Sequence, residues 1–350
     1  SYCEDWPAVA RRYEAWWAHD VIDRPLVTAS VNRDPVRRIT RRVDLIDDPE
    51  RWLAAKLQDL AQVRRVGDAL PFIRVEMPIL SGMMGSRSEY SPEEDTVWTW
   101  PTIRDDWSNM PEWRWRDDDP LLNTMRTLTR MVSEDSVGRY LVGSAGIGMG
   151  GDSLMTMRGS SELCIDVIEQ PERIMRAIEA YYPLWIGLVR EFYNITTAAG
   201  AGLMHVTVPV WSNRPYVCIQ CDFSFMISTR HLSHIFLPEI ARQAATLGRS
   251  VFHLDGPGVA NHIDAILEVP DIQAIQWVPG VGMESILSWV PMLQKIQRRG
   301  RSLQVICPPE EVLPICQALK PEGLMITLGR SLAEPDLLAL YEGFCKQYRV

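Results

Sequence analysis

Residues 250–278 read SVFHLDGPGVANHIDAILEVPDIQAIQWV, and this stretch decides the predicted fold. It begins with the run SVFHLD and ends with the run AIQWV. Both runs are short and largely apolar, and a Gly-Pro or Pro-Gly pair follows each of them directly. Runs of this kind, bounded by turn residues, are typical of strands. The stretch therefore predicts two successive strands, at 250–255 and 274–278.

Runs of the same kind recur along the chain and alternate with longer helical patterns. The predicted strands are 25–31, 72–77, 140–146, 202–208, 250–255, 274–278, 303–307 and 324–328. The predicted helices are 49–66, 160–198, 228–247, 283–299, 310–319 and 332–348. Eight such repeats predict an α/β fold, a closed (β/α)8 TIM barrel. The alternative is an open doubly wound sheet, but that fold commonly has a glycine-rich turn after its first strand, and residues 30–34 contain no glycine.

The barrel is predicted to span residues 1–350 as a single domain with two additions. Residues 1–24 predict an N-terminal helical extension, and residues 78–139 form a long insertion after the second predicted strand. The insertion carries the tryptophans Trp98, Trp100, Trp107, Trp113 and Trp115, interleaved with acidic residues. Such a segment is typical of a lid or a partner surface. The alternative is a small subdomain that packs against the barrel.

Composition and charge exclude several classes of protein. The 350 residues are 46% hydrophobic and 23% charged, as in an ordinary globular protein. A net charge of −9 would repel nucleic acid and anionic membranes, so we expect neither as a partner. We find no apolar run of membrane-spanning length and no resemblance to a signal peptide in the first twenty residues. Seven scattered cysteines do not indicate a disulfide scaffold, and we expect a cytoplasmic protein.

Candidate functional residues follow from one rule, that the chemistry of a βα barrel gathers at the carboxyl ends of its strands. The residues that this rule selects are Arg33, Glu76, His205, Trp211, His253, Asp255, Gln276, Trp277, Cys307 and Arg330. His253 and Asp255 are two apart on a strand, so their side chains point to the same side. With Cys307 they predict a zinc site that has an open fourth position. The alternative is a hydrogen-bonded histidine without a metal.

The other selected residues suggest proton transfer and substrate binding. Glu76 and His205 are predicted to be catalytic, since a buried carboxyl or imidazole can move a proton. Each has a structural alternative, an ion pair for Glu76 and a hydrogen-bonded core position for His205. Gln276, Trp277 and Trp211 predict an aromatic, hydrogen-bonding pocket.

One further motif is the pair Cys218-x-x-Cys221, in the long connection 209–228. Its spacing is that of a soft-metal or redox pair. The alternative is chance spacing in a chain with seven cysteines.

Several segments resemble the uroporphyrinogen decarboxylase superfamily. They are DSLMTMRGSSELCID at 152–166 with EQPERIM at 169–175, DFSFMIS at 222–228 leading into FLPE at 236–239, and FHLDG at 252–256. The resemblance spans residues 140–345 and implies a (β/α)8 barrel. It implies either a porphyrinogen decarboxylase or a zinc-dependent methyltransferase that exchanges methyl groups between corrinoid proteins and thiols. It also places Asp222 near the barrel mouth, as a further catalytic candidate; the alternative is a helix N-cap.

The two branches of the superfamily imply different residues. The methyltransferase branch carries His-x-Cys at the end of strand 5 and a cysteine at the end of strand 8. Here those places hold His253-x-Asp255 and Gly329-Arg330-Ser331. The decarboxylase branch has arginines after strand 1 and an aspartate near the end of strand 2. Here Arg33 and Glu76 lie near those places.

We therefore predict a metal-assisted methyltransferase or demethylase that acts on a small organic substrate, with zinc as its metal and a corrinoid protein as methyl donor or acceptor. Glu76, His205 or Asp222 would move a proton. The predicted substrate-binding residues are Arg33, Trp211, Gln276, Trp277 and Arg330. The alternatives are a metal-independent decarboxylase, in which Arg33 or Arg330 holds a carboxylate and Glu76 supplies the proton, and a non-catalytic binding subunit. The resemblance further implies a homodimer.

Overall fold

The structure is a computed structural model that describes residues 3, 5–33, 48–75, 87–91, 96–104, 107–109, 114, 117–118, 120–144, 147–205, 207–280, 285–330 and 332–348. Its strands are β1 (Leu26–Asn32), β2 (Val63–Gly67), β3 (Phe72–Arg74), β4 (Arg87–Ser91), β5 (Thr96–Trp100), β6 (Leu141–Ser144), β7 (Leu203–His205), β8 (Val217–Ile219), β9 (Ser250–Asp255), β10 (Ala274–Val278), β11 (Ser302–Cys307) and β12 (Leu324–Leu328). Its α-helices are α1 (Trp6–Trp17), α3 (Pro49–Gln62), α5 (Pro120–Ser136), α6 (Gly150–Arg158), α7 (Ser160–Glu169), α8 (Pro171–Ala198), α9 (Thr229–His231), α10 (Leu237–Thr246), α11 (Gly256–Ala260), α12 (Ile263–Leu267), α13 (Val290–Arg298), α14 (Val312–Ala318) and α15 (Glu334–Gln347).

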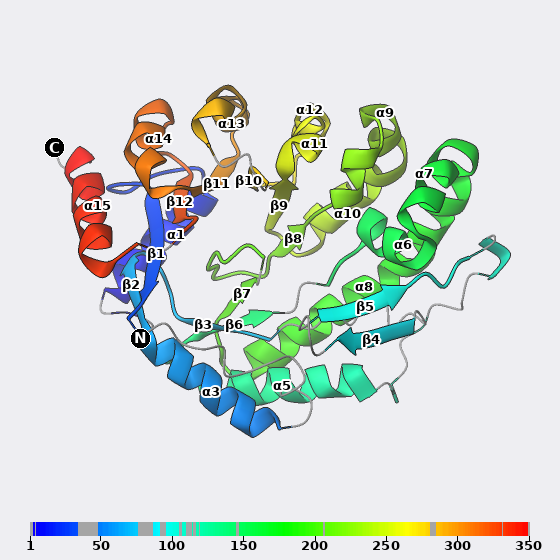
Figure 1. Cartoon of the computed structure of the whole chain (residues 1–350), viewed down its shortest axis with the longest axis horizontal. Coiled ribbons are helices and arrows are strands. Elements are labelled where there is room, and N and C mark those ends of the chain that lie inside the picture. The colour runs from blue at the N-terminus through cyan, green and yellow to red at the C-terminus, as the bar shows by residue number, and fades with distance from the viewer. Residues whose placement is uncertain are drawn as a thin grey trace.

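Parallel strands form the centre of the molecule, and helices surround them (Figure 1). One sheet has the order β2-β1-β12-β11-β10-β9-β8, and a second has the order β3-β6-β7. All of these pairings are parallel except that of β2 with β1. The predicted α/β class with parallel strands is confirmed. In the described part of the chain no backbone ladder joins the two sheets, so the hydrogen bonding by itself does not close a ring.

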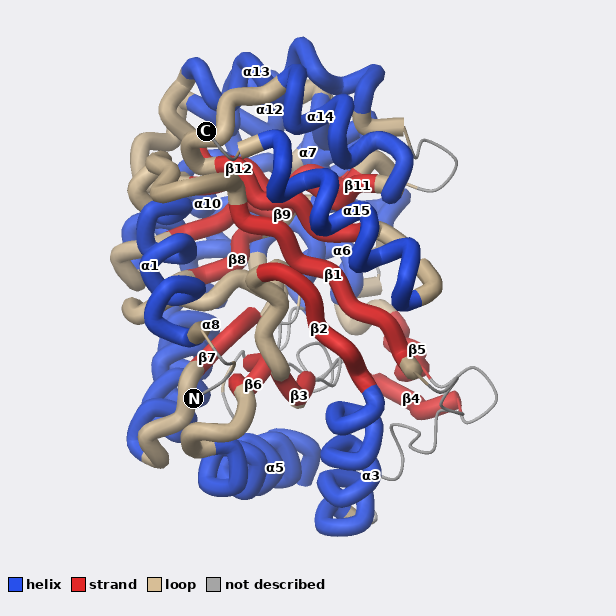
Figure 2. The backbone as a smooth tube through the Cα atoms, turned by 90° about the vertical axis from the view of Figure 1, so that its left-hand side faces the viewer, coloured by secondary structure: helices blue, strands red, loops and turns tan. Residues whose placement is uncertain are grey.

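Two strands differ from the sequence prediction. The helix predicted at 49–66 ends at Gln62, and β2 then returns antiparallel along β1 (Figure 2). Gly67, the last residue of β2, has φ +72°, and a Cβ atom there would lie 2.4 Å from the Val27 carbonyl oxygen. The second difference is β8, which lies inside the connection predicted at 209–228. Three residues are too short a run to produce a clear alternation signal.

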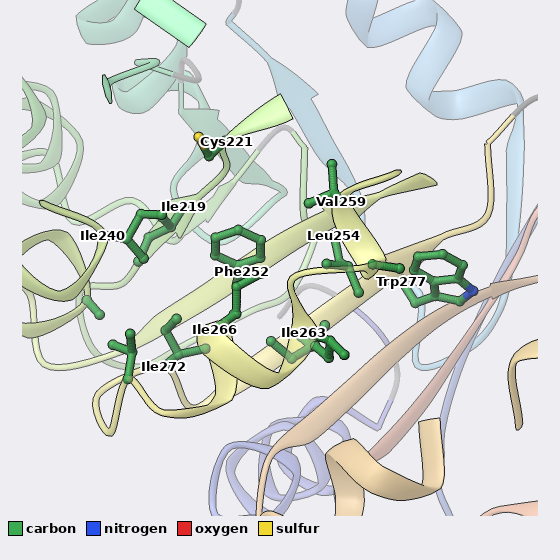
Figure 3. Packing of buried hydrophobic residues seen from close by; sticks show 14 of the residues in the cluster. Ile219, Cys221, Ile240, Phe252, Leu254, Val259, Ile263, Ile266, Ile272 and Trp277 are labelled. Carbon is green, nitrogen blue, oxygen red and sulfur yellow. The ribbon is translucent and has the colours of Figure 1, made fainter. Parts of the chain in front are cut away.

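The two faces of the large sheet bury different residues. The face toward the helices carries Phe252, Leu254 and Trp277, which pack with Val259 and Ile263 of the following helices (Figure 3). The opposite face, called the inner face here, carries the alternate residues. At the amino ends of the strands these inner residues are apolar, namely Leu26, Val251, Ala274 and Met325.

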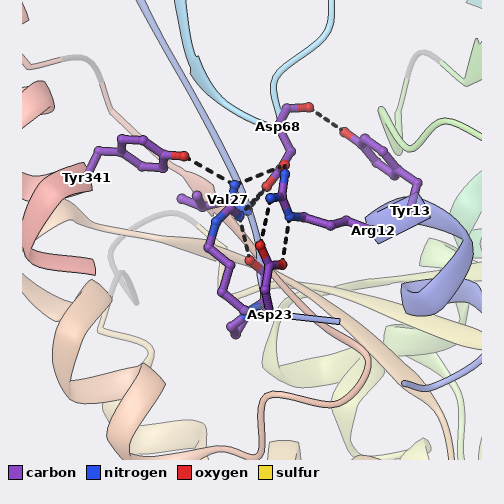
Figure 4. Close-up of polar contacts among 8 residues, drawn as sticks. Arg12, Tyr13, Asp23, Val27, Asp68 and Tyr341 are labelled. Atoms are coloured by element: carbon purple, nitrogen blue, oxygen red, sulfur yellow. Dashed lines mark hydrogen bonds and ion pairs between the residues drawn. The ribbon is translucent and has the colours of Figure 1, made fainter. Parts of the chain in front are cut away.

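Helix α1 covers this amino end. Its Tyr13, Trp16 and Trp17 belong to the same apolar cluster as the inner residues at the strand starts. Beside them Asp68 is buried and paired with Arg24 at 2.5 Å and Arg12 at 3.2 Å (Figure 4). Asp68 also accepts a hydrogen bond from the Val27 amide at 3.0 Å. The extension predicted at 1–24 therefore packs tightly under the strands.

The insertion predicted at 78–139 contains the hairpin β4–β5 and helix α5. Trp98 and Trp100 are exposed on the hairpin, whereas Trp107 is buried and donates its indole N–H to Asp166 of α7. Trp113 and Trp115 lie outside the described residues. One part of the insertion thus packs on the fold while another presents indoles to solvent, and its role as a lid stays a prediction.

No helix in the described ranges is both long and apolar enough to cross a membrane.

Candidate functional site

Three side chains converge at the carboxyl ends of β8 and β9. They are Asp222, His253 and Asp255, and each offers a ligand atom within 4.8 Å of the other two. His253 Nε2 lies 3.9 Å from Asp255 Oδ2. The spacing of two along β9 places His253 and Asp255 on one side, as the alternation requires. Asp222 begins a short 3-10 turn, Asp222–Met226, just after the neighbouring strand β8.

The surroundings of Asp222 disfavour its charged form. Burial and the nearby carboxylates Asp152 and Asp255 raise the pKa of Asp222 to about 7. Its Oδ1 atom is buried without a hydrogen-bond partner. Buried polar atoms are rarely left unpaired, so this oxygen indicates a missing ligand.

The other oxygen of Asp222 is oriented by a small network. Gln220 Nε2 donates to Asp222 Oδ2 at 3.4 Å and to Asp152 Oδ2 at 3.1 Å. Asp152 Oδ1 in turn accepts the Phe223 amide at 2.8 Å. Gln220 and Asp152 therefore act as positioning residues, which hold Asp222 with Oδ1 unengaged.

His253 is oriented from the opposite side by a polar belt across the inner face. The belt consists of His253, Gln276, Gln304, Thr327 and Thr28, one residue from each of the adjacent strands β9, β10, β11, β12 and β1. His253 Nδ1–H donates to Gln276 Oε1 at 2.5 Å, and Gln276 Nε2 donates to Gln304 Oε1 at 2.9 Å. Gln304 Nε2 donates to Thr327 Oγ1 at 3.0 Å, which lies 2.9 Å from Thr28 Oγ1. With its Nδ1 proton engaged, neutral His253 presents the Nε2 lone pair toward Asp222 and Asp255.

The donor set fits a divalent metal ion. Two carboxylates and one imidazole suit zinc in a catalytic site, which has three protein ligands and an open position. The unpartnered Oδ1 of Asp222 and the hydrogen bond to His253 Nδ1 match the usual pattern around metal ligands.

The predicted third ligand, Cys307, does not belong to this group. Gln304 faces inward on β11, so Cys307, three residues further on, lies on the opposite face. Its side chain is buried in the helix-facing core, with Sγ directed at the Pro308 carbonyl at 3.3 Å. Burial also raises the pKa of the Cys307 thiol. Asp222, predicted as a catalytic residue, occupies the place that was expected for Cys307.

The predicted aromatic pocket is not assembled. Gln276 and Trp277 are adjacent on β10 and so face opposite sides; Gln276 joins the belt, while Trp277 is buried against Trp289 with ring centroids 4.7 Å apart. Trp211 lies at the amino end, where it packs against Trp6 at 5.0 Å and Tyr13 at 6.3 Å. The strand-end rule fails for Trp211 because the chain turns back after β7, and Trp211 pairs antiparallel with Met204.

His205 is not part of the group of three ligands, although it is close enough to His253 for the two imidazoles to interact electrostatically. It lines a small cavity of about 40 Å³ beside α8, and its Nδ1 accepts the Thr207 amide at 3.1 Å. Burial, with smaller effects of His253 and Arg74, lowers the pKa of His205 to about 3. These contacts match the structural alternative for His205, a neutral hydrogen-bonded imidazole.

The arginines of the decarboxylase alternative have carboxylate partners. Arg33 forms a two-bond pair with Glu334, both bonds 3.0 Å long, and Arg330 pairs with Glu310 at 2.7 Å. Glu76 lies outside the described residues. In the described part of the chain nothing favours the decarboxylase.

Cys218 and Cys221 are free thiols on different faces of the sheet. Cys221 belongs to the helix-facing core, and Cys218 packs against the inner apolar cluster. Burial raises the pKa of both thiols, which disfavours the thiolate that metal binding or redox exchange requires.

Sequence reasoning missed several polar residues near the site. Glu239 of α10 is buried beside Gly150, and burial raises the pKa of Glu239 to about 8. Gln304 has a visible signal, since it is a polar residue inside the apolar run SLQVIC. Gln220 and Asp152 have no such signal, because only the tertiary structure brings α6 next to β8.

The comparisons with known proteins agree with the fold. No protein-family model matches the sequence, and no curated protein sequence is similar to it. Among solved structures, a methyltransferase from Methanosarcina mazei superimposes with a TM-score of 0.61 at 11% sequence identity. The match covers 97% of this chain and 99% of that protein. At this identity the likeness establishes that the two chains share a fold over nearly their whole lengths.

Proposed function

We propose that the protein is a zinc-assisted methyltransferase that acts on a small organic substrate and exchanges the methyl group with a corrinoid protein. The observation that carries the proposal is the group Asp222, His253 and Asp255, in which a buried carboxylate oxygen has no partner. The fold shared with a methyltransferase supports the transferase class. The corrinoid partner is proposed because the sequence resembles the uroporphyrinogen decarboxylase superfamily.

The proposal includes a closed (β/α)8 barrel. Two observations support it: the polar belt links five adjacent strands on one face, and the helices follow the strands in order (Figure 1). A barrel also explains why the three ligands meet, because the carboxyl ends of its strands converge on one face.

The roles of the residues follow from their contacts. Asp222, His253 and Asp255 would hold the ion. A divalent ion there would supply Lewis acidity, which would favour the deprotonated form of a thiol or hydroxyl group of the methyl acceptor. Gln276 fixes the tautomer of His253, while Gln220 and Asp152 orient Asp222. Asp222 and Asp255 each have a second carboxylate oxygen, which can accept the proton that the acceptor loses.

Metal analysis combined with a methyl-transfer assay tests this function. We expect about one zinc per chain in the purified protein and its loss in His253→Ala and Asp222→Asn. Transfer of methyl groups from methylcobalamin to small thiols should fall at least a thousandfold in both variants, because the acceptor is no longer activated. His234→Ala, which removes an exposed histidine before α10, is the matched control and should change neither quantity. Full activity in metal-free protein would contradict the proposal.

A further inference from the structure

A cavity of about 600 Å³ lies between β1, β2, β3 and helix α3, beside the edge strands β2 and β3 of the two sheets. This volume is ordinary for a small-molecule site. Its wall is partly apolar, with Leu60, Leu70, Phe72, Ile73 and Met204. The hydroxyls of Thr28 and Thr327 also line it, so one end of the polar belt borders the cavity.

The charged residues of the wall are mainly cationic. They are Lys56, Arg65, Arg74 and Arg330, against the single carboxylate Asp59. Arg330 already has a partner in Glu310. The charge of this wall therefore favours an anionic ligand.

Arg65 is the most informative of these residues. Its Nη1 and Nη2 atoms donate to the carbonyls of Val63 and Leu60, at 3.1 and 3.2 Å. These bonds fix the guanidinium in place, yet in the described part of the chain Arg65 pairs with no carboxylate. Burial lowers the pKa of Arg65, and no neighbouring charge offsets that effect.

Arg64, the neighbour of Arg65 on β2, behaves differently. It points away from the cavity, is half exposed and lies 3.9 Å from Glu334. The two adjacent arginines thus differ in exposure and in partner: exposed Arg64 has an acidic neighbour, and partly buried Arg65 forms no ion pair with a described carboxylate. Removing a charge from water without a counter-charge is costly, and a charged ligand would offset that cost.

We propose that this cavity binds the carboxylate of a small organic acid with an apolar or aromatic body. Arg65 supplies the charge partner, since a guanidinium can meet a carboxylate with two parallel hydrogen bonds. The Thr28 hydroxyl supplies a further hydrogen bond, and the apolar wall receives the rest of the ligand. A guanidinium that two backbone carbonyls hold in place, next to apolar side chains, matches a carboxylate on an apolar body.

The polar belt connects this ligand to His253. Gln304 donates to Thr327, so the Thr327 hydroxyl can donate to Thr28 and leave the Thr28 hydroxyl proton for a ligand in the cavity. Cavity and candidate metal site therefore border one continuous hydrogen-bonded chain. The step from ligand to substrate rests on the proposed function: the acid would be the substrate class of the methyltransferase.

Binding to metal-free protein tests the inference separately from catalysis. We would titrate protein kept in EDTA with benzoate, 2-naphthoate, the neutral analogue 2-naphthamide and inorganic phosphate, using calorimetry. We expect at least one carboxylate to bind and 2-naphthamide to bind at least tenfold more weakly than 2-naphthoate. Arg65→Gln should weaken carboxylate binding at least tenfold, whereas Arg64→Gln, the matched control, should stay within twofold.

Three results would overturn the inference: no binding by either carboxylate, equal binding by Arg65→Gln and the unsubstituted protein, or tighter binding of phosphate than of either carboxylate. Circular dichroism checks that Arg65→Gln is folded. If it is not, Thr28→Val replaces it and should weaken binding at least threefold; unchanged binding there is equally adverse. Zinc content and methyl transfer are measured apart, so a failed metal site leaves the binding result intact, and failed binding leaves the metal result intact.

Discussion

Acidic side chains have different partners at the two ends of the parallel strands. At the amino end Asp68 is satisfied by Arg24, Arg12 and the Val27 amide. At the carboxyl end the acids Asp152, Asp222, Asp255 and Glu239 gather, and none of them forms an ion pair with a described lysine or arginine. The amino end therefore stabilises the fold, while the carboxyl end keeps carboxyl groups without a cationic partner available for a ligand. Substitutions at either end test this difference.

The largest effect is expected at the amino end. Asp68→Asn should lower the free energy of unfolding by about 3–5 kcal/mol, since it leaves two guanidinium groups without their buried carboxylate. Urea unfolding at pH 7 measures this loss. Asp23→Asn, which removes an exposed partner of Arg12, is the control and should cost about 1 kcal/mol or less. Equal effects of the two substitutions would contradict the stabilising role of the buried Asp68.

At the carboxyl end Glu239 should make the fold sensitive to pH. Its pKa is about 8 in the folded chain, above the ordinary glutamate value, so the unfolded chain ionises first as the pH rises. Stability is then lost progressively up to about pH 8, by about 1.4 kcal/mol per pH unit. Glu239→Gln removes this loss, and between pH 6 and 8 it should gain about 2–3 kcal/mol over the unsubstituted protein.

Urea unfolding at pH 6, 7 and 8 provides the measurement. Glu179→Gln, at an exposed glutamate paired with Arg242, should leave the pH dependence unchanged. A Glu239→Gln profile parallel to that of the unsubstituted protein would show that Glu239 is ionised in the fold.

The polar belt predicts a smaller effect on metal binding. Gln276→Met should weaken zinc affinity about 10–100-fold, because His253 loses the acceptor that fixes its tautomer. Gln304→Met, one strand further along the belt, should change it less than about threefold, since Gln304 does not touch His253. Competition with a zinc-binding dye measures both affinities. If the two variants bind zinc equally, Gln276 does not act as a positioning residue.

The smallest effect is expected at Arg33, predicted from sequence as a substrate-binding residue. Because its partner is Glu334 on the surface, Arg33→Ala should leave the midpoint of urea unfolding nearly unchanged. Its kcat/KM for methyl transfer should stay within about twofold of that of the unsubstituted protein. A large loss of activity would instead restore Arg33 to the substrate site.

The sequences of the strands are enough to predict many of the side chains that lie on the inner face of the sheet. Leu26 and Thr28, Val251 and His253, and Ala274 and Gln276 each place an apolar residue two positions before a polar one. A period of two puts both members of each pair on the inner face, the apolar one toward the amino end. The same rule, applied strictly, excludes Trp277 from that face once Gln276 is placed there. The strand-end rule alone had selected both.

Local alternation and spacing were enough to predict the class of fold, most of the strands and the position of His253 beside Asp255. The folded chain was needed to show that Asp222 joins them, that Cys307 and Trp211 lie elsewhere, and that Arg65 lines a cavity. Those outcomes depend on which strands become neighbours and on β8, a strand that the sequence pattern did not predict. Contacts between distant segments leave no periodic trace in the chain, so the candidate site emerges only when the strands lie side by side.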